Sequence, residues 1–240
     1  MRNYLIIDGQ DSRDFGVYIS GQATFGSPAV AYNMISVPGR NGDLIGLERR
    51  LQNIEVSYPA FIYTNFAENI KDLRNFLTSR DGYVRISDTY HDGEFRMGVF
   101  RGAFTPEVIR TNTAGQFTLS FNCKPQRFLI SGETAVENPS ILTNPTLFDA
   151  RPLIVVKDSG SDISGTIEIG SSTITLEDIP SGEDIIIDCE MMDIYSESGI
   201  NYNANATLTD YEFPVLHAGD NGVSKDGIGD IEITPRWWIV

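Results

Sequence analysis

The side chains that most often carry catalysis or bind metals are scarce in this sequence. It contains two histidines, His91 and His217, and two cysteines, Cys123 and Cys189. Neither histidine belongs to a His-x-x-x-His pair of the kind that zinc sites use, and the cysteines lack metal-ligand spacing. We expect both histidines to lie in surface loops and both cysteines to be free thiols. The sequence therefore predicts no catalytic residue, no metal and no cofactor.

Carboxylates are abundant, so a cluster of them needs a second criterion before it indicates a site. The turn around residues 88–94 contains Asp88, Asp92 and Glu94. A calcium loop of the Asp-x-Asp-x-Asp-Gly type would place an acidic or amide side chain in its middle position, which Tyr90 occupies here. This mismatch favours a solvated turn.

A hydrolase with paired carboxylates is the enzymatic alternative. Glycosidases need two carboxyl groups at a set separation, which a sequence alone does not give. The chain contains no Gly-x-Ser-x-Gly elbow and no phosphate-binding loop, so no other enzyme class is indicated. The carboxylates considered for this alternative are Asp158, Asp162 and Glu168.

The charge balance limits which partners the chain can bind. Acidic residues outnumber basic ones by 33 to 18, which gives a net charge of −15. A protein that grips nucleic acid needs clustered Lys and Arg, and the densest such group here is Arg49-Arg50. The first apolar run, residues 4–7, is too short for a signal peptide, and no other run approaches the length of a membrane span. We expect no sequence-specific nucleic acid, no membrane, and synthesis in the cytoplasm.

The first half of the chain has the pattern of β-strands with one helix. Every second residue from Phe117 to Cys123 is apolar, which is typical of a half-buried strand. The run from Ile54 to Tyr58 alternates in the same way, and we expect Pro59 to end it. Further strands are expected at residues 30–37, 83–87 and 95–104.

One helix is predicted, over residues 65–80. Asn65 is the expected N-cap, with Glu68 as its capping-box partner, and Asp81-Gly82 is the expected stop. Apolar side chains follow a helical spacing and predict one stripe that packs on a sheet. The stripe consists of Phe66, Ile70, Leu73 and Leu77.

The composition becomes polar around residues 125–140, where we place a linker. After it, short strands recur between glycines without a helical pattern, which indicates a β-sandwich. The sequence thus predicts a mainly β protein with two domains, residues 1–131 and 132–240. The expected strands of the second domain are residues 153–157, 165–169, 173–176, 185–189 and 228–234. The adjacent Trp237 and Trp238 point to opposite faces of a strand, so we expect core or interface burial for them.

One loop is distinctive because it combines two places for a positive φ angle. Pro38-Gly39 turns the chain, and Asn41-Gly42 follows directly. The segment resembles the Pro-Gly-Arg-(Asp/Asn)-Gly loop in the first domain of the distal tail proteins (Dit) of siphophages. Its residues are Pro38, Gly39, Arg40, Asn41, Gly42 and Asp43.

Other segments resemble the same family in the same order, so that the resemblance covers essentially the whole chain. In the first half these are residues 4–8, 14–17, 65–80, 83–87 and 121–125. In the second half they are residues 152–156, 185–189, 213–216, 219–221 and 231–237. The chain resembles the short form of the family, since it has no room for an inserted carbohydrate-binding module.

The resemblance implies a structural virion protein without enzymatic activity. It implies a homohexameric ring at the tail tip that joins the tail tube protein to the tail-associated hub or lysin protein, carries receptor-binding or fibre proteins, and encloses a lumen for DNA. The first domain, β-barrel-like or split-sheet with one α-helix, would build the ring, and the second would be a galectin-like β-sandwich. Assembly would take place in the host cytoplasm. We expect residues 38–43, above all Arg40, to contribute to a contact between subunits or with a neighbouring tail protein.

A lectin-like module that binds cell-wall saccharide is the alternative function. It would need solvent-facing aromatic rings on one face of the sandwich. The candidates are Tyr195, Tyr202 and Tyr211.

Overall fold

The computed structural model describes residues 2–21, 25–102, 104–109 and 113–240, apart from the side chains of residues 47–49. The described chain is mainly β, with 49% of it in strands, and contains one α-helix. It divides into two compact units, Met1–Arg127 with Val240, and Phe128–Ile239. Each unit has its own hydrophobic core. The predicted fold class is confirmed.

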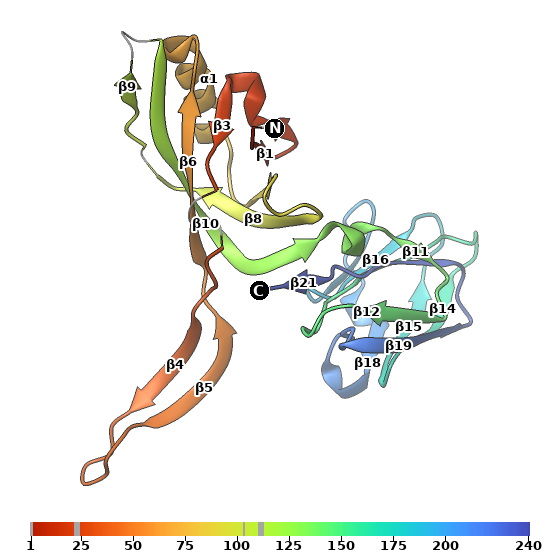
Figure 1. Ribbon diagram of the computed structural model, residues 1–240. Coiled ribbons are helices and arrows are strands. Elements are labelled where there is room, and N and C mark those ends of the chain that lie inside the picture. Colours follow the sequence, from red (N-terminus) through yellow and green to blue (C-terminus); the bar gives the residue numbers. More distant parts are fainter. Residues whose placement is uncertain (1, 22–24, 103, 110–112) are drawn as a thin grey trace. The chain divides into compact units, whose positions relative to one another are not determined.

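The first unit is built around one curled sheet of antiparallel strands (Figure 1). The order of the strands is β2-β1-β7-β8-β10-β6-β3, and β9 also pairs with β10. Its elements are β1 (Leu5–Ile7), β2 (Gln10–Asp11), the 3-10 helix η1 (Ser12–Phe15), β3 (Val17–Ile19), β6 (Ile54–Ile62), α1 (Phe66–Thr78), β7 (Val84–Asp88), β8 (Glu94–Phe100), β9 (Glu107–Ile109) and β10 (Ala114–Leu129). Two further strands of this unit, β4 (Val30–Ile35) and β5 (Leu44–Leu51), pair only with each other among the described strands.

The core of the first unit lies between the sheet and α1. The predicted stripe of the helix is buried, with Leu73 0% exposed, and packs in one cluster with the alternating side chains of β6 and β10. Apolar burial of this kind contributes about 1.5–3 kcal/mol for each large side chain. With 13 residues, α1 is short, and no described helix is long and apolar enough to span a membrane.

The ends of α1 differ from the prediction. Asn65 occupies the N-cap position, but its backbone is left-handed (φ 52°, ψ 37°) and its side chain makes no capping hydrogen bond. The amide of Asn69 instead donates to the carbonyl oxygen of Thr64 at 3.1 Å. The helix ends at Thr78, before the predicted stop, and the N–H of Ser79 still donates to the carbonyl of Asn75 at 3.1 Å.

The predicted end of β6 at Pro59 is wrong, because the strand continues to Ile62. Pro59 lies opposite Thr118 of β10, and its carbonyl accepts from the N–H of Ser20 at 2.8 Å. In an antiparallel strand the N and C=O of one residue point to the same side. The missing N–H of Pro59 therefore faces the end of β3, which pairs only as far as Ala60, and β10 loses no hydrogen bond.

The second unit is a sandwich of two sheets with strand orders β11-β20-β13-β16-β17 and β12-β19-β14-β15-β18. Both sheets contribute to one core, with Ile154 and Ile233 from the first sheet and Ile167 and Ile174 from the second fully buried. Its elements are η2 (Ile130–Glu133), β11 (Val136–Glu137), β12 (Ile141–Asn144), β13 (Leu153–Val156), β14 (Ile163–Ile169), β15 (Ser172–Ile179), β16 (Ile185–Asp188), β17 (Asp193–Ser196), η3 (Asn203–Asn205), β18 (Ala206–Leu208), η4 (Thr209–Tyr211), β19 (Gly219–Asp226), β20 (Ile231–Thr234) and β21 (Trp238–Ile239).

The segment predicted as a linker forms regular structure instead. Strand β10 runs through Pro125 to Leu129, η2 follows directly, and β11 pairs with β20. The N–H of Leu129 donates to the carbonyl of Trp237 at 2.9 Å. Backbone pairing thus overrides the polar composition of residues 125–140. Trp237 is 6% exposed, which agrees with the burial expected for it.

Candidate interface on the β4–β5 hairpin

Residues 38–43 lie at the tip of the hairpin that β4 and β5 form. Pro38 and Gly39 make a turn in which the N–H of Arg40 donates to the carbonyl of Val37 at 3.2 Å. Gly39 and Gly42 both have positive φ, 80° and 82°, as the sequence predicts. Proline followed by such a glycine is the sequence that a type II turn requires. The turn-forming residues therefore place all six predicted interface residues at one exposed tip.

Arg40 is exposed at this tip. No carboxylate of the described residues forms an ion pair with its guanidinium. An arginine fork that is free of internal partners is suited to bind a carboxylate or a carbonyl on another molecule. Arg40 is thus accessible for the role expected of it.

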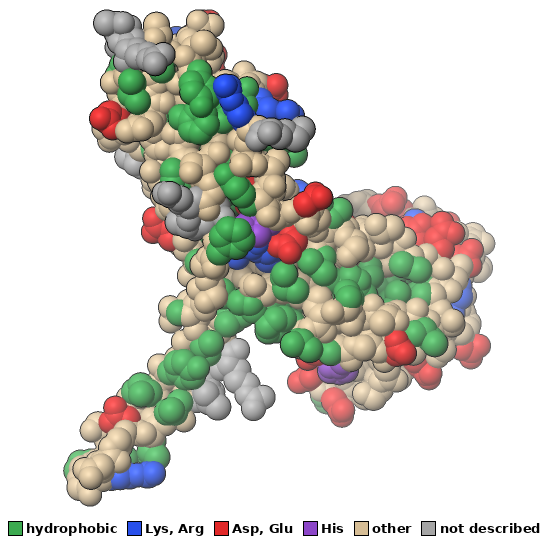
Figure 2. Space-filling view, in the orientation of Figure 1, with side chains coloured by type: hydrophobic (Ala, Val, Ile, Leu, Met, Phe, Trp, Pro, Cys, Tyr) green, Lys and Arg blue, Asp and Glu red, His purple; other side chains and the backbone are tan. Residues whose placement is uncertain are grey.

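The two strands below the tip expose apolar side chains. Met34 and Ile45 are each 59% exposed, and Tyr32 is 56% exposed. Met34 lies directly opposite Ile45 in the register, and Ile35 lies opposite Leu44. Because directly opposed residues share a face and alternate residues repeat it, Tyr32, Met34 and Ile45 form one apolar face of the hairpin. Figure 2 shows hydrophobic side chains along the hairpin.

This apolar face was not predicted from the sequence. A strand was expected at residues 30–37, but the expectation of a strand does not tell whether its apolar side chains are covered by the protein's own core. The signal that could have predicted the face is the presence of apolar runs on both sides of the Pro38-Gly39 turn. An isolated two-stranded hairpin is marginally stable in water. An exposed apolar face on such a hairpin is typical of surfaces that bind another molecule.

The prediction of a surface loop is wrong for His91 and right for His217. The His91 side chain is 11% exposed, and its Nδ1 lies 2.8 Å from Oδ1 of Asp88. Asp88 also accepts from the hydroxyl of Tyr58 at 2.9 Å, and the ring of Phe25 packs 4.8 Å from the imidazole. The carboxylate therefore anchors the turn against β6. The His217 side chain is 63% exposed in its loop.

The carboxylates considered for hydrolysis serve as local acceptors. Asp158 accepts from the N–H of Gly160 at 3.1 Å, and Asp162 accepts from the N–H of Ser181 at 3.1 Å. Glu168 accepts from the hydroxyl of Ser224 at 2.8 Å. Among the described residues, no group of three His, Cys, Asp or Glu side chains is placed to hold a metal. These hydrogen bonds give each of the three carboxylates a structural role in a turn or a sheet.

A groove of about 550 Å³ lies on the sheet of the first unit. Its described lining includes Phe61, Glu107 and Gln116, together with serine and threonine hydroxyls. Glu107 already accepts from the amide of Gln116 at 2.6 Å. Among the described lining residues Glu107 is the one acidic side chain and none is basic, so it has no second acid or base with which to form an acid–base pair.

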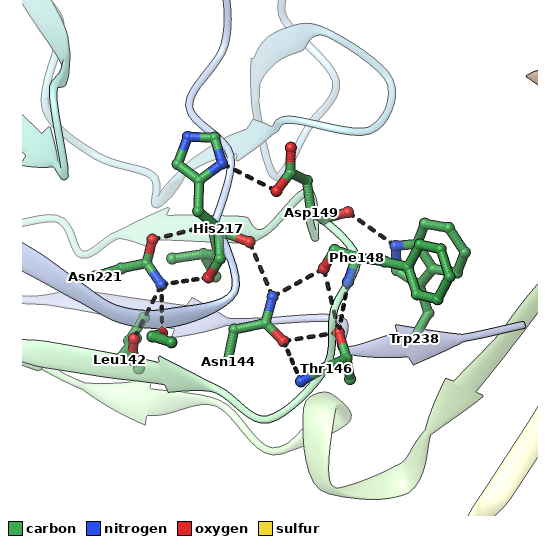
Figure 3. Close-up of polar contacts among 10 residues, drawn as sticks. Leu142, Asn144, Thr146, Phe148, Asp149, His217, Asn221 and Trp238 are labelled. Carbon is green, nitrogen blue, oxygen red and sulfur yellow. Dashed lines mark hydrogen bonds and ion pairs between the residues drawn. The ribbon is translucent and has the colours of Figure 1, made fainter. Parts of the chain in front are cut away.

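In the sandwich, a polar network missed by the sequence analysis joins two loops (Figure 3). Asn144, 3% exposed, donates to the carbonyls of Phe148 and Leu216 at 2.9 and 3.0 Å. Asn221, 4% exposed, donates to the carbonyls of Leu142, His217 and Gly219. These contacts satisfy buried backbone carbonyls, so the network is structural.

The aromatic rings of the lectin-like alternative do not form a shared exposed face. Tyr211 is 95% exposed. Tyr202 packs against the hydrophobic core, and Tyr195 is half-buried in β17. A sugar-stacking surface made of these three rings is therefore not present.

Comparison with known proteins identifies the fold. No protein-family model and no curated protein sequence matches the chain. Its fold is that of a solved phage protein. It is similar to the crystal structure of SPP1 Dit (gp 19.1), with a TM-score of 0.74 over 100% of both chains and 17% sequence identity. That protein is described as a paradigm of the hub adsorption apparatus in phages that infect Gram-positive bacteria.

Proposed function

We propose that this chain is a non-enzymatic structural protein of a siphophage tail tip, of the distal tail family. The observation that carries the proposal is the fold similarity to SPP1 Dit over the full length of both chains. The sequence supports the proposal independently of the fold. Its support is the loop at residues 38–43 and the order of the other segments that resemble the family. In this proposal the protein is located in the virion, and it is made and assembled in the cytoplasm of the bacterial host.

The subunits form a homohexameric ring through the first domain, residues 1–131. A closed ring needs two different patches on each subunit. The hairpin supplies one of them, with the apolar face of Tyr32, Met34 and Ile45 and the exposed guanidinium of Arg40. Burying such a face against a neighbouring copy removes apolar surface from water, which drives association.

The ring joins the tail tube protein to the tail-associated hub or lysin protein and carries receptor-binding or fibre proteins. The second domain, residues 132–240, is the galectin-like sandwich and projects outward. DNA passes through the lumen of the ring. The net charge of −15 suits this passage, since a negative surface repels DNA and prevents it from adhering.

The mass of the purified full-length chain in solution tests the proposal. We expect light scattering to give six times the chain mass of 26.6 kDa. Met34→Glu places a charge on the apolar face of the hairpin and should shift the population to smaller species. Met191, which is 71% exposed in the sandwich, offers a matched control, and Met191→Glu should leave the mass unchanged.

Arg40→Ala tests the tip of the hairpin separately. We expect weaker ring formation with an unchanged melting temperature, because Arg40 contacts no described acidic side chain within its own subunit. A wild-type chain that stays monomeric at high concentration, and for which no partner restores a ring, would contradict the proposed assembly. Equal masses for both methionine variants would remove the hairpin from the interface and leave the ring itself standing.

A further inference from the structure

The chain contains two Asn-Gly pairs, Asn41-Gly42 and Asn221-Gly222, in opposite surroundings. An Asn-Gly pair is the sequence in which an asparagine side chain reacts most readily with its own backbone, since glycine has no side chain to hinder the approach. Whether the reaction occurs depends on how freely both residues move. The two pairs therefore form an internal comparison within one protein.

The reaction is a deamidation that needs only water. The amide nitrogen of glycine loses its proton and attacks Cγ of the asparagine, which forms a C–N bond. The bond between Cγ and Nδ2 breaks, and ammonia leaves with the proton, so that a five-membered succinimide remains. Water then adds to one of the two imide carbonyls and opens the ring, which yields aspartate or isoaspartate.

Asn41 satisfies the conditions for this reaction. It is exposed at the tip of the hairpin, outside both strands. Gly42 has a φ of 82°, and a Cβ built at this residue would have no heavy atom within 4 Å. No described hydrogen bond holds the side chain of Asn41. The peptide group of Gly42 and the carboxamide of Asn41 can therefore reorient without displacing a neighbour.

Asn221 is held against the same reaction. It is 4% exposed and lies in β19, where it pairs with Leu142 and Gly222 pairs with Ile141. Its amide nitrogen, the leaving group, donates to the carbonyls of His217 and Gly219, each at 2.9 Å. Its Oδ1 accepts from the N–H of His217 at 2.9 Å (Figure 3). Ring closure at Asn221 requires this part of the sandwich to open first.

We propose that Asn41 is a site of spontaneous deamidation and that Asn221 is protected by its hydrogen bonds. The product adds a carboxylate between Arg40 and Asp43, and isoaspartate also lengthens the backbone by one methylene. With Arg40 and Asp43 as the charged side chains of residues 38–43, this change makes a net neutral tip negative. If the hairpin contacts a neighbouring subunit, as the proposed function states, unassembled subunits lose their ability to form rings as they age.

Peptide mapping by mass spectrometry tests the site. The full-length protein is incubated in dilute solution at mildly alkaline pH, and samples taken over time are digested and analysed for conversion of each asparagine. We expect conversion at Asn41 to be at least about tenfold faster than at Asn221, because the buried strand must open before it reacts. In urea the two rates should become similar, because both asparagines precede glycine. Equal rates in the native protein, or no conversion at Asn41 while the unfolded chain reacts, would overturn the proposal.

The consequence for assembly is measured on the same samples. Asn41→Gln is the matched variant, because glutamine would have to close a six-membered ring and reacts far more slowly. Aged wild-type protein and fresh Asn41→Asp should both form fewer rings than fresh wild-type protein, whereas aged Asn41→Gln should not decline. If Asn41 is converted but ring formation is unaffected, the modification site stands and its effect on assembly is refuted.

Discussion

Two of the antiparallel strand pairs in the first unit have opposite surroundings. In the β6–β10 pair, every second side chain faces α1 and is buried, as Val56 and Phe121 are. In the β4–β5 pair, apolar residues such as Met34 and Ile45 alternate in the same way but remain more than half exposed. The same local pattern therefore stabilises the subunit in one case. In the other it leaves apolar surface exposed to solvent.

The difference lies in what covers each pair. Removing apolar surface from water stabilises the fold by about 25 cal/mol for each Å² buried. The β6–β10 pair is stabilised in this way by burial within its own chain. The hairpin would be stabilised in this way only when another molecule covers it. Substitutions should therefore separate into those that affect unfolding and those that affect only association.

Truncation of the core should have the largest effect. Leu73→Ala removes a fully buried side chain from the interface between α1 and the sheet, so we expect a loss of about 2–5 kcal/mol in the free energy of unfolding. Met34→Ala should change it by less than about 0.5 kcal/mol, because Met34 is exposed. Urea unfolding followed by circular dichroism measures both. A similar cost for the two variants would show that the hairpin packs within its own subunit.

The next effect compares two arginines. Arg236 donates to both carboxylate oxygens of Asp188, at 2.8 and 3.1 Å, and Asp188 is 6% exposed. Arg236→Met leaves this carboxylate buried without its partner, which should cost about 3 kcal/mol. Arg40→Ala should leave the stability of the subunit unchanged. Thermal unfolding of the two variants at neutral pH gives the comparison.

The ion pair between Arg236 and Asp188 also predicts that the stability of the protein falls in acid. Burial opposes ionisation of Asp188, but Arg236 and the N–H groups of Met191 and Glu190 outweigh it and lower the pKa of this carboxyl. A lowered pKa in the folded state contributes stability that is present above the ordinary value of about 3.9 and is lost as pH falls through the folded value. We expect this loss in the wild type and a smaller one in Arg236→Met. Parallel pH profiles of the two would contradict the assignment.

A smaller effect separates two tyrosines. Burial, together with the charge and hydrogen bond of Asp88, raises the pKa of Tyr58 well above its ordinary value, so that its hydroxyl remains a donor. Tyr58→Phe should cost about 1 kcal/mol because Asp88 loses one of its donors. Tyr32→Phe on the exposed hairpin should cost almost nothing. Chemical denaturation distinguishes the two outcomes.

The last prediction concerns the reactivity of thiols and should leave stability unchanged. Burial raises the pKa of Cys123 to about 11 and that of Cys189 to about 12, so neither thiol ionises near neutral pH. We expect neither to react with a disulfide reagent until the chain unfolds. Ser36→Cys, placed beside the exposed tip, should react at once in the native protein. Rapid reaction of the wild type would show that one of the cores opens readily.

Local patterns in the sequence determined the elements that depend on near neighbours. The alternation from Phe117 to Cys123, the apolar stripe of α1 and the positive φ angles of Gly39 and Gly42 all follow from the side chain at each position. Strand pairing and turn geometry act over a few residues, so the mainly β class and the position of the tip at residues 38–43 were predictable.

Tertiary structure decided the features that depend on distant partners. Pro59 stays inside β6 because β3 ends beside it, and the His91 side chain is only 11% exposed because Asp88 and Phe25 pack against it. Met34 and Ile45 are exposed because, among the described strands, β4 and β5 pair only with each other, which their own sequence does not specify. Burial results from contacts between segments far apart in the chain, and a local sequence pattern does not encode which segment covers which face.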